Sequence, residues 1–297
     1  YMSDKMTDEE VDALFDENTR LVFGETIANP ALSVLDISRF AALAHRHGVP
    51  LVVDNTFATP CLCRPFEHGA DIVTHSTSKY MDGHANVLGG VIVDGGAFDW
   101  AASGKFPELT EPDESYHGVV YTESFGKAAY ITKARVQLLR DFGATPMPLG
   151  AYLLNLGLET LHLRIRRHSE NALAVARFLQ GHEKVLWVNY PGLEGGKYHE
   201  IAQTYLPDGA SGVVSFGVKG GRAAAMHLMN SLKLARIVTH VADARTSVLH
   251  PASTTHRQLT DAQLAEAGIG PEFIRFSVGI EDVRDILADL GQALDQI

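Results

Sequence analysis

Two short apolar segments, residues 50–53 and 71–74, most restrict how this chain can fold. Each has the length of a buried strand, and residues 60–68 between them have helical character. Strands that alternate with helices form a parallel sheet, and continuous apolar runs suit strands covered on both faces. Polar side chains follow where the two runs stop: Asp54, Ser76, Ser78 and Lys79. Because ligands bind beyond the carboxyl ends of such strands, we expect a binding site there.

The same alternation extends through the first third of the chain. Thr7 opens a capping box that predicts a helix start, and Asp36 and Gly48 bracket a second helix with one apolar face. Further strands are expected at residues 21–23 and 89–93. The sequence therefore predicts an α/β fold with a mostly parallel sheet.

The remainder of the chain has a different pattern. Residues 95–125 form a long polar excursion, and two long helical patterns follow at 124–142 and 147–180. We expect the second helix to lead into a smaller C-terminal α/β domain that ends in an amphipathic helix. Its strands are predicted at 185–189, 212–218 and 273–278. The chain thus has two predicted domains, 1–160 and 161–297.

Composition and charge exclude several classes of partner. The chain has 297 residues, of which 45% are hydrophobic, so it can bury the cores of two domains. Its formal net charge is −11 and its basic residues are scattered, which argues against nucleic acid or an anionic membrane surface as partner. No apolar run approaches the roughly 18 residues of a membrane span. The two cysteines, Cys61 and Cys63, are too close in sequence to bridge, which favours a reducing, cytoplasmic location.

Two further patterns are interpreted as structural. His250 and His256 are spaced like metal ligands, but no third ligand accompanies them, so we expect no metal. Nothing near Cys61 or Cys63 indicates a lowered thiol pKa, and buried structural thiols are the commoner case.

The polar residues near the strand ends each have a chemical and an ordinary interpretation. The amine of Lys79 follows an apolar strand, and desolvating or cationic surroundings would make it a nucleophile, although most lysines are simply exposed. Asp54 could cap the next helix, and Ser76 and Ser78 could form a turn. Asn29 precedes a proline and could be only a turn residue.

Arg275 lies in an otherwise apolar strand, where an unpaired guanidinium is costly. Its planar, permanently charged fork suits a carboxylate of a small substrate, and such a pair contributes roughly 1.5–3 kcal/mol. A salt bridge to a nearby Glu or Asp is the alternative.

The run Asp-Asn-Thr-Phe-Ala-Thr-Pro from Asp54 to Pro60, followed by Ser-Thr-Ser-Lys from Ser76 to Lys79, resembles a known family. It is similar to the Cys/Met metabolism family of pyridoxal phosphate (PLP) enzymes, which have fold type I. The resemblance runs from Glu25 to the last predicted helix.

The resemblance implies that PLP is the cofactor and that Lys79 carries it. Asp54 would pair with the pyridine nitrogen and keep it protonated. Ser76 and Ser78 match positions that bind the phosphate, and Asn29 matches an asparagine that contacts the ring hydroxyl.

Longer motifs resemble the sulfhydrylase branch of the family, namely residues 79–84, 116–118, 187–191 and 250–256. This implies a γ-replacement in which O-acetyl-L-homoserine and sulfide give L-homocysteine and acetate, with Arg275 binding the substrate carboxylate. The alternatives are a cystathionine γ-synthase or γ-lyase of the same family, or a non-catalytic truncated fragment or assembly partner.

The chain also differs from the family pattern in several places. Family members carry a long N-terminal segment before the point where this sequence begins, so we expect a fragment that lacks the phosphate loop and the tyrosine stacked on the ring. A homotetramer built from dimers is expected by resemblance. His240 and Ala242 stand where relatives often have Asn and Gly.

Overall fold

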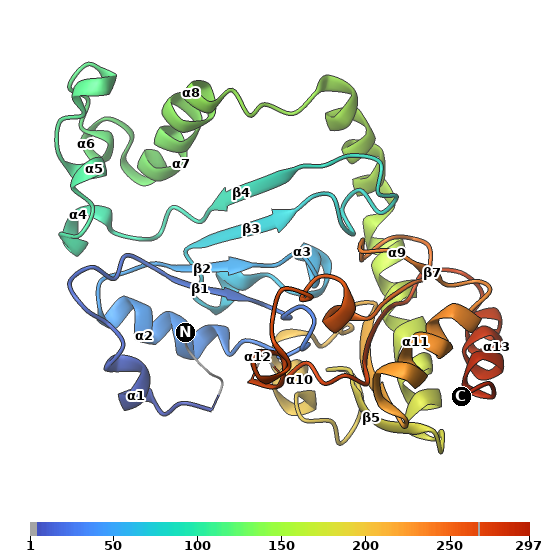
Figure 1. Cartoon of the computed structure of the whole chain (residues 1–297). Coiled ribbons are helices and arrows are strands. Elements are labelled where there is room, and N and C mark those ends of the chain that lie inside the picture. The colour runs from blue at the N-terminus through green and yellow to red at the C-terminus, as the bar shows by residue number, and fades with distance from the viewer. Residues whose placement is uncertain (1–4, 267) are drawn as a thin grey trace.

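The structure is a computed structural model that describes residues 5–266 and 268–297. Its first sheet has the strand order β1-β2-β3-β4: Val22–Glu25, Leu51–Asp54, Ile72–Ser76 and Gly90–Asp94. Strands β1, β2 and β3 are parallel, and β4 is antiparallel to β3. The predicted mostly parallel sheet is therefore confirmed, and it has one antiparallel edge strand (Figure 1).

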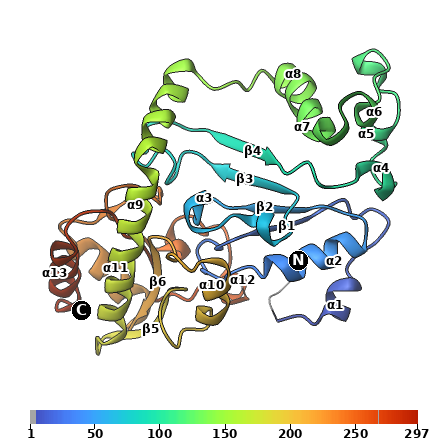
Figure 2. The ribbon, with the colours of Figure 1, turned by 180° about the vertical axis from the view of Figure 1, so that it is seen from behind.

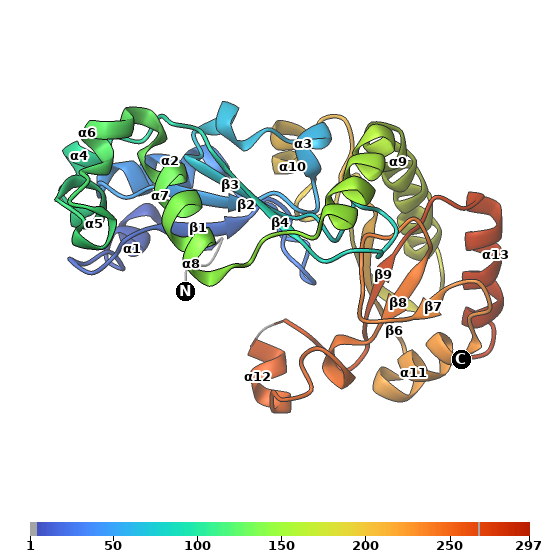
Figure 3. The same cartoon turned by 90° about the horizontal axis from the view of Figure 1, so that it is seen from above.

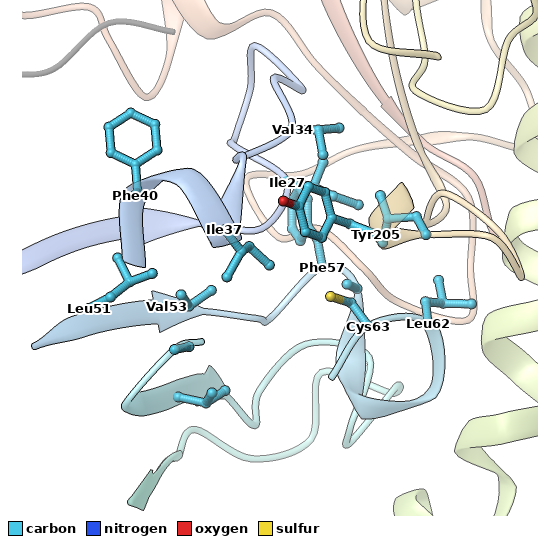
Figure 4. Packing of buried hydrophobic residues seen from close by; sticks show 14 of the residues in the cluster. Ile27, Val34, Ile37, Phe40, Leu51, Val53, Phe57, Leu62, Cys63 and Tyr205 are labelled. Atoms are coloured by element: carbon cyan, nitrogen blue, oxygen red, sulfur yellow. The ribbon is translucent and has the colours of Figure 1, made fainter. Parts of the chain in front are cut away.

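Helix α2 (Ile37–Arg46) packs against this sheet because one of its faces is apolar. Asp36 caps it as predicted, since its side chain accepts a hydrogen bond from the backbone N–H three residues later. Figure 4 shows Ile37 pointing toward Val53 of β2, and both side chains are fully buried. The short helix α1 (Asp8–Asp12) begins with the predicted capping box.

The prediction of one continuous helix at residues 60–68 is wrong. Helix α3 covers Thr59–Leu62, and the separate 3-10 helix η1 covers Pro65–His68. Pro65 has no backbone N–H, and the residue before a proline is forced away from helical angles. Arg64 accordingly has φ −118° and ψ 87°, so no single helix runs through.

The predicted excursion at 95–125 contains short helices: α4 (Trp100–Ser103), α5 (Pro107–Thr110), η2 (Glu114–Tyr116) and α6 (Tyr121–Phe125). An aromatic cluster holds them together, with the rings of Trp100 and Phe106 centred 4.9 Å apart. The same cluster includes Val52 and Ile72 of the sheet. Apolar residues within a polar stretch thus fold the segment onto the sheet.

The predicted helix at 124–142 is interrupted. Gly126, with φ +53°, ends α6, because this conformation cannot continue a helix. The segments that follow are η3 (Gly126–Ala128), α7 (Ala129–Lys133), the π-helical η4 (Ala134–Leu139) and α8 (Arg140–Phe142). The predicted helix at 147–180 is confirmed as α9 (Pro148–Gln180), with proline at its first position.

The second sheet has the order β5-β6-β9-β8-β7: Val185–Asn189, Val213–Val218, Phe273–Ser277, Ser247–Leu249 and Arg236–Ile237. The three predicted strands are confirmed as β5, β6 and β9. Its core is shared with α9 and two further helices, α11 (Gly221–Ser231) and α13 (Val283–Leu294). The remaining elements are α10 (His199–Tyr205), η5 (Pro251–Ser253) and α12 (Asp261–Glu266).

Helix α9 connects the two sheets. Figures 1 and 2 show its first turns beside the β3–β4 side of the first sheet and its last turns beside the second sheet. Figure 3 shows the two sheets next to each other, seen from above. The domain boundary near residue 160 stays a prediction. Within the described ranges, no helix combines the length and the apolar character needed to cross a membrane.

Candidate active site

The ends of β2 and β3 are tied together by polar groups. The Thr56 N–H donates to Asp54 Oδ1 at 2.8 Å, which orients the carboxylate at the end of β2. The Thr56 hydroxyl oxygen accepts from the Ser76 N–H, also at 2.8 Å. Asp54 and Ser76 therefore end neighbouring strands and share one bridging residue, as the order of motifs predicts for a site at this edge.

A second carboxyl lies beside Asp54. Glu25 ends β1 and is paired with Asp54 in the strand register. Burial raises the pKa of Glu25, and the negative charge of Asp54 raises it further. The Glu25 carboxylate also accepts the Asn29 N–H at 2.9 Å. Sequence reasoning did not single out Glu25, and its only signal was its place at a strand end.

Lys79 lies in the turn after β3, where its N–H donates to the Ser76 carbonyl oxygen. Burial lowers the pKa of its amine, and the positive charge of Arg275 lowers it further. Both effects disfavour the ammonium form, so more of the amine is neutral near physiological pH than in an exposed lysine. A neutral amine is the form that attacks an aldehyde.

Arg275 is at the centre of β9 and is 5% exposed. Its guanidinium donates to Asn29 Oδ1 at 3.2 Å and to the Thr239 carbonyl oxygen at 2.9 Å. Burial lowers its pKa to about 10, so the group stays charged at neutral pH. Among the residues that the structure describes, it has no carboxylate partner, and its Nε is buried without an acceptor. The positive charge is thus neutralised by no acid of the described chain.

The two serines differ in what their side chains do. The Ser78 hydroxyl is buried, accepts the Gly89 N–H at 2.9 Å and donates to the Gly89 carbonyl oxygen at 3.3 Å. It therefore fastens the turn after β3 to the start of β4. Ser76 is partly exposed at the strand end. The phosphate roles of Ser76 and Ser78 stay predictions.

His240 was noticed in the sequence only as a departure, yet it lies beside the Lys79 amine. Its Nδ1 lies 3.4 Å from Lys79 Nζ. Burial lowers the pKa of its imidazole, and the nearby Lys79 charge lowers it further, which favours the neutral ring. Its Nε2 is buried and has no hydrogen-bond partner among the residues that the structure describes. No local pattern marks this contact, because the two residues are 161 positions apart.

The residues present fit PLP. The cofactor needs an amine for its aldehyde, a carboxylate for its ring nitrogen and polar donors for its phosphate. Lys79 supplies an amine with a lowered pKa, and Asp54 supplies a fixed carboxylate. Beside them, the Nε of Arg275 is a buried donor that has no acceptor in the described chain, which suits a bound anionic group. No group of three or more His, Cys, Asp or Glu residues able to hold a metal exists in the described ranges.

Comparisons with known proteins give a consistent result. A family profile described as Cys/Met metabolism PLP-dependent enzyme matches residues 1–295. A homocysteine synthase of Schizosaccharomyces pombe is 51% identical over 285 residues, which is 95% of this chain and 66% of that protein. An O-acetyl-L-homoserine sulfhydrylase of Leptospira meyeri is 47% identical over 290 residues, 95% of this chain and 65% of that protein.

A solved structure from Campylobacter jejuni has the same fold. It is described as an O-acetylhomoserine (thiol)-lyase with N'-pyridoxyl-lysine-5'-monophosphate, and its TM-score is 0.92 at 36% identity. The match covers 97% of this chain and 68% of that one. The chain spans about two thirds of the length of the curated relatives that it matches.

Proposed function

The chain belongs to the Cys/Met metabolism PLP-dependent enzyme family, and we propose that it serves a γ-replacement on an amino-acid substrate. In the proposed reaction the Cγ–O bond of O-acetyl-L-homoserine breaks, acetate leaves, and sulfide forms the new Cγ–S bond of L-homocysteine. The names of the similar proteins support this choice. The observation that carries it is Arg275, a buried cation without a carboxylate partner in the described chain, close enough to Lys79 to lower its pKa.

We propose that the predicted residues hold cofactor and substrate as follows. Lys79 would bind the PLP aldehyde, and Asp54 would keep the pyridine nitrogen protonated. Ser76 and Ser78 would contact the phosphate, and Asn29 the ring hydroxyl. PLP, when bound, withdraws electrons and so makes the carbon-bound hydrogens next to the substrate amine acidic.

The chain's own groups would move the protons. Once the substrate amine has displaced Lys79 from the cofactor aldehyde, the freed Lys79 amine would take the proton from Cα at its Nζ and could return it to a neighbouring carbon. Arg275 orients the substrate by a two-pronged bond to its carboxylate. His240 Nδ1 lies 3.4 Å from Lys79 Nζ, and this contact would hold the amine in one direction.

The reaction is tested by its dependence on sulfide. The protein is incubated with PLP and O-acetyl-L-homoserine, with and without sulfide, and homocysteine and acetate are quantified. We expect equal amounts of both products, and only when sulfide is added. A γ-elimination product formed without sulfide would instead favour a γ-lyase, and the sulfhydrylase proposal would be wrong.

Replacing Arg275 with lysine is expected to raise the KM for O-acetyl-L-homoserine about tenfold, with a smaller change in kcat. Lysine keeps the charge but loses the planar fork that pairs with a carboxylate. Steady-state kinetics measure the change, and Arg236→Lys, at an exposed position of the same sheet, is the control. An unchanged KM in the Arg275 variant would place the carboxylate elsewhere.

We also propose that the protein works in the cytoplasm as a homo-oligomer, a tetramer by family resemblance. Light scattering at several concentrations measures the mass directly. A monomer at all concentrations would contradict this part of the proposal.

A further inference from the structure

Arg164 of helix α9 is a buried cation that the proposed reaction does not use. Its side chain is 6% exposed, although it belongs to a helix with much exposed surface. Its Nε donates to the Thr160 hydroxyl at 3.0 Å, on the same helix. One terminal nitrogen donates to the Tyr80 carbonyl oxygen at 2.7 Å, and the other to those of Met81 at 3.3 Å and Gly157 at 2.7 Å.

The positions of these acceptors are informative. The carbonyls of Tyr80 and Met81 belong to the two residues that follow Lys79 directly. Burying a guanidinium is costly unless its donors are satisfied, and here neutral oxygens satisfy them without an ion pair in the described chain. A planar fork with several donors can bind neighbouring carbonyls at once, which a lysine cannot do in the same geometry. The fork therefore restrains the backbone that carries Lys79.

Two glycines allow this close approach. Gly157 precedes Arg164 by two helical turns and so lies on the same face of α9. A Cβ at Gly157 would lie 2.4 Å from the Met81 carbonyl oxygen and 2.6 Å from that of Asp82. A Cβ at Gly83 would lie 2.3 Å from a terminal nitrogen of Arg164. The face of α9 thus contacts the turn at residues 80–83 so closely that a Cβ at either glycine would clash.

The same turn is held from the second sheet. The Tyr80 side chain is fully buried, and its hydroxyl oxygen accepts the Gly212 N–H at 3.0 Å, one residue before β6. The Gly83 N–H donates to the Lys79 carbonyl oxygen at 2.7 Å and closes the turn. The backbone of Lys79 is thus fixed on both sides by elements far away in sequence.

We propose that Arg164 and Gly157 of α9 form a clamp on the turn at residues 79–83, and that this clamp sets the position of the Lys79 amine. Arg164 is a positioning residue in this role, because it acts through the backbone and not by contact with the amine. The inference rests on the proposed function only in taking Lys79 as the PLP-binding residue. The alternative is that Arg164 merely fastens α9 to the first sheet, which would affect stability alone.

The test measures the Lys79 amine itself, in the full 297-residue chain without cofactor. Competitive acetylation with acetic anhydride over a range of pH, followed by peptide mass spectrometry, gives the midpoint at which Lys79 becomes reactive. The variants are Arg164→Lys, which keeps the charge but not the fork, and Gly157→Ala, which keeps Arg164 but displaces the turn. Arg166→Gln, at an exposed position of the same helix, is the control. Thermal melting is recorded first, and labelling is done well below each transition.

We expect the wild-type midpoint to lie below the ordinary lysine value of 10.5. In Arg164→Lys and Gly157→Ala it should rise toward 10.5, because a loosened turn exposes the amine to water. Trapping of PLP on Lys79 with borohydride should fall about tenfold in both variants and stay unchanged in Arg166→Gln.

Lower melting temperatures with an unchanged Lys79 midpoint in both variants would overturn the clamp and leave a purely structural role. The readouts also separate the two proposals. A wild-type chain that traps no PLP on Lys79 would refute the proposed function, while the acetylation midpoints would still decide the clamp.

Discussion

Replacing Lys79 with alanine is expected to abolish covalent attachment of PLP to the chain. In the proposed function this amine condenses with the PLP aldehyde, and burial together with the charge of Arg275 lowers its pKa and so favours the neutral form that attacks an aldehyde. Incubation with PLP, reduction with borohydride and peptide mapping should place a pyridoxyl group on Lys79 in the wild type. The variant should show none, and activity should be lost with it.

The control for this experiment is Lys127→Ala, at an exposed position. It should trap PLP on Lys79 as the wild type does, because the substitution leaves the surroundings of Lys79 unchanged. Pyridoxyl groups spread over several lysines, or a cofactor absorbance that persists in Lys79→Ala, would refute the assignment of Lys79.

The second large effect is a loss of stability in mild acid, caused by His168 of α9. Burial lowers the pKa of His168 to about 4, and the charge of Arg164 contributes in the same direction. Its Nδ1–H donates to the Val278 carbonyl oxygen at 2.7 Å, while Nε2 is buried and has no partner within the described ranges. Protonation would place a second positive charge in a dry site near Arg164.

The sign of this pH effect on stability follows from the number of protons that each state binds. Between the unfolded value of 6.5 and the folded value of about 4, the unfolded chain binds a proton at His168 that the folded chain does not. The free energy of unfolding therefore falls as the pH falls through this window, by about 3 kcal/mol in total. Above pH 6.5 both states are neutral at this residue, and the contribution is complete.

Urea unfolding at several pH values from 7 to 4 measures the contribution of His168 to the free energy of unfolding. Between pH 6.5 and 4, we expect the free energy of unfolding of His168→Gln to fall by about 3 kcal/mol less than that of the wild type, whatever the stability of the variant at pH 7. His162 is an exposed histidine on the same helix, and His162→Gln should keep the wild-type dependence of the free energy of unfolding on pH. Equal slopes for the wild type and His168→Gln would show that His168 takes up its proton in the folded state near its usual pKa.

Much of the first sheet follows from local sequence. The apolar face between Asp36 and Gly48 predicts α2, and two apolar runs of four residues predict β2 and β3, all within two residues of their bounds. The predictions failed where a local break mattered more than the average pattern. Pro65 divided one predicted helix, and Gly126 interrupted another. Strands β7 and β8, of two and three residues, are too short to carry a periodic signal.

The candidate site also has a part that the sequence determined and a part that only the tertiary structure decided. The sequence determined the candidate groups: Asp54 and Lys79 lie at or just after the ends of apolar runs, Arg275 is a charge within one, and the family resemblance of their motifs implied their roles. Only the tertiary structure decided their surroundings: His240 beside the Lys79 amine, Asn29 on Arg275, and Arg164 on the turn after Lys79. These pairs are 161, 246 and 84 positions apart. Local periodicity reflects neighbours along the chain, whereas such contacts depend on how whole strands and helices pack, and that is settled by the burial of two cores joined by α9.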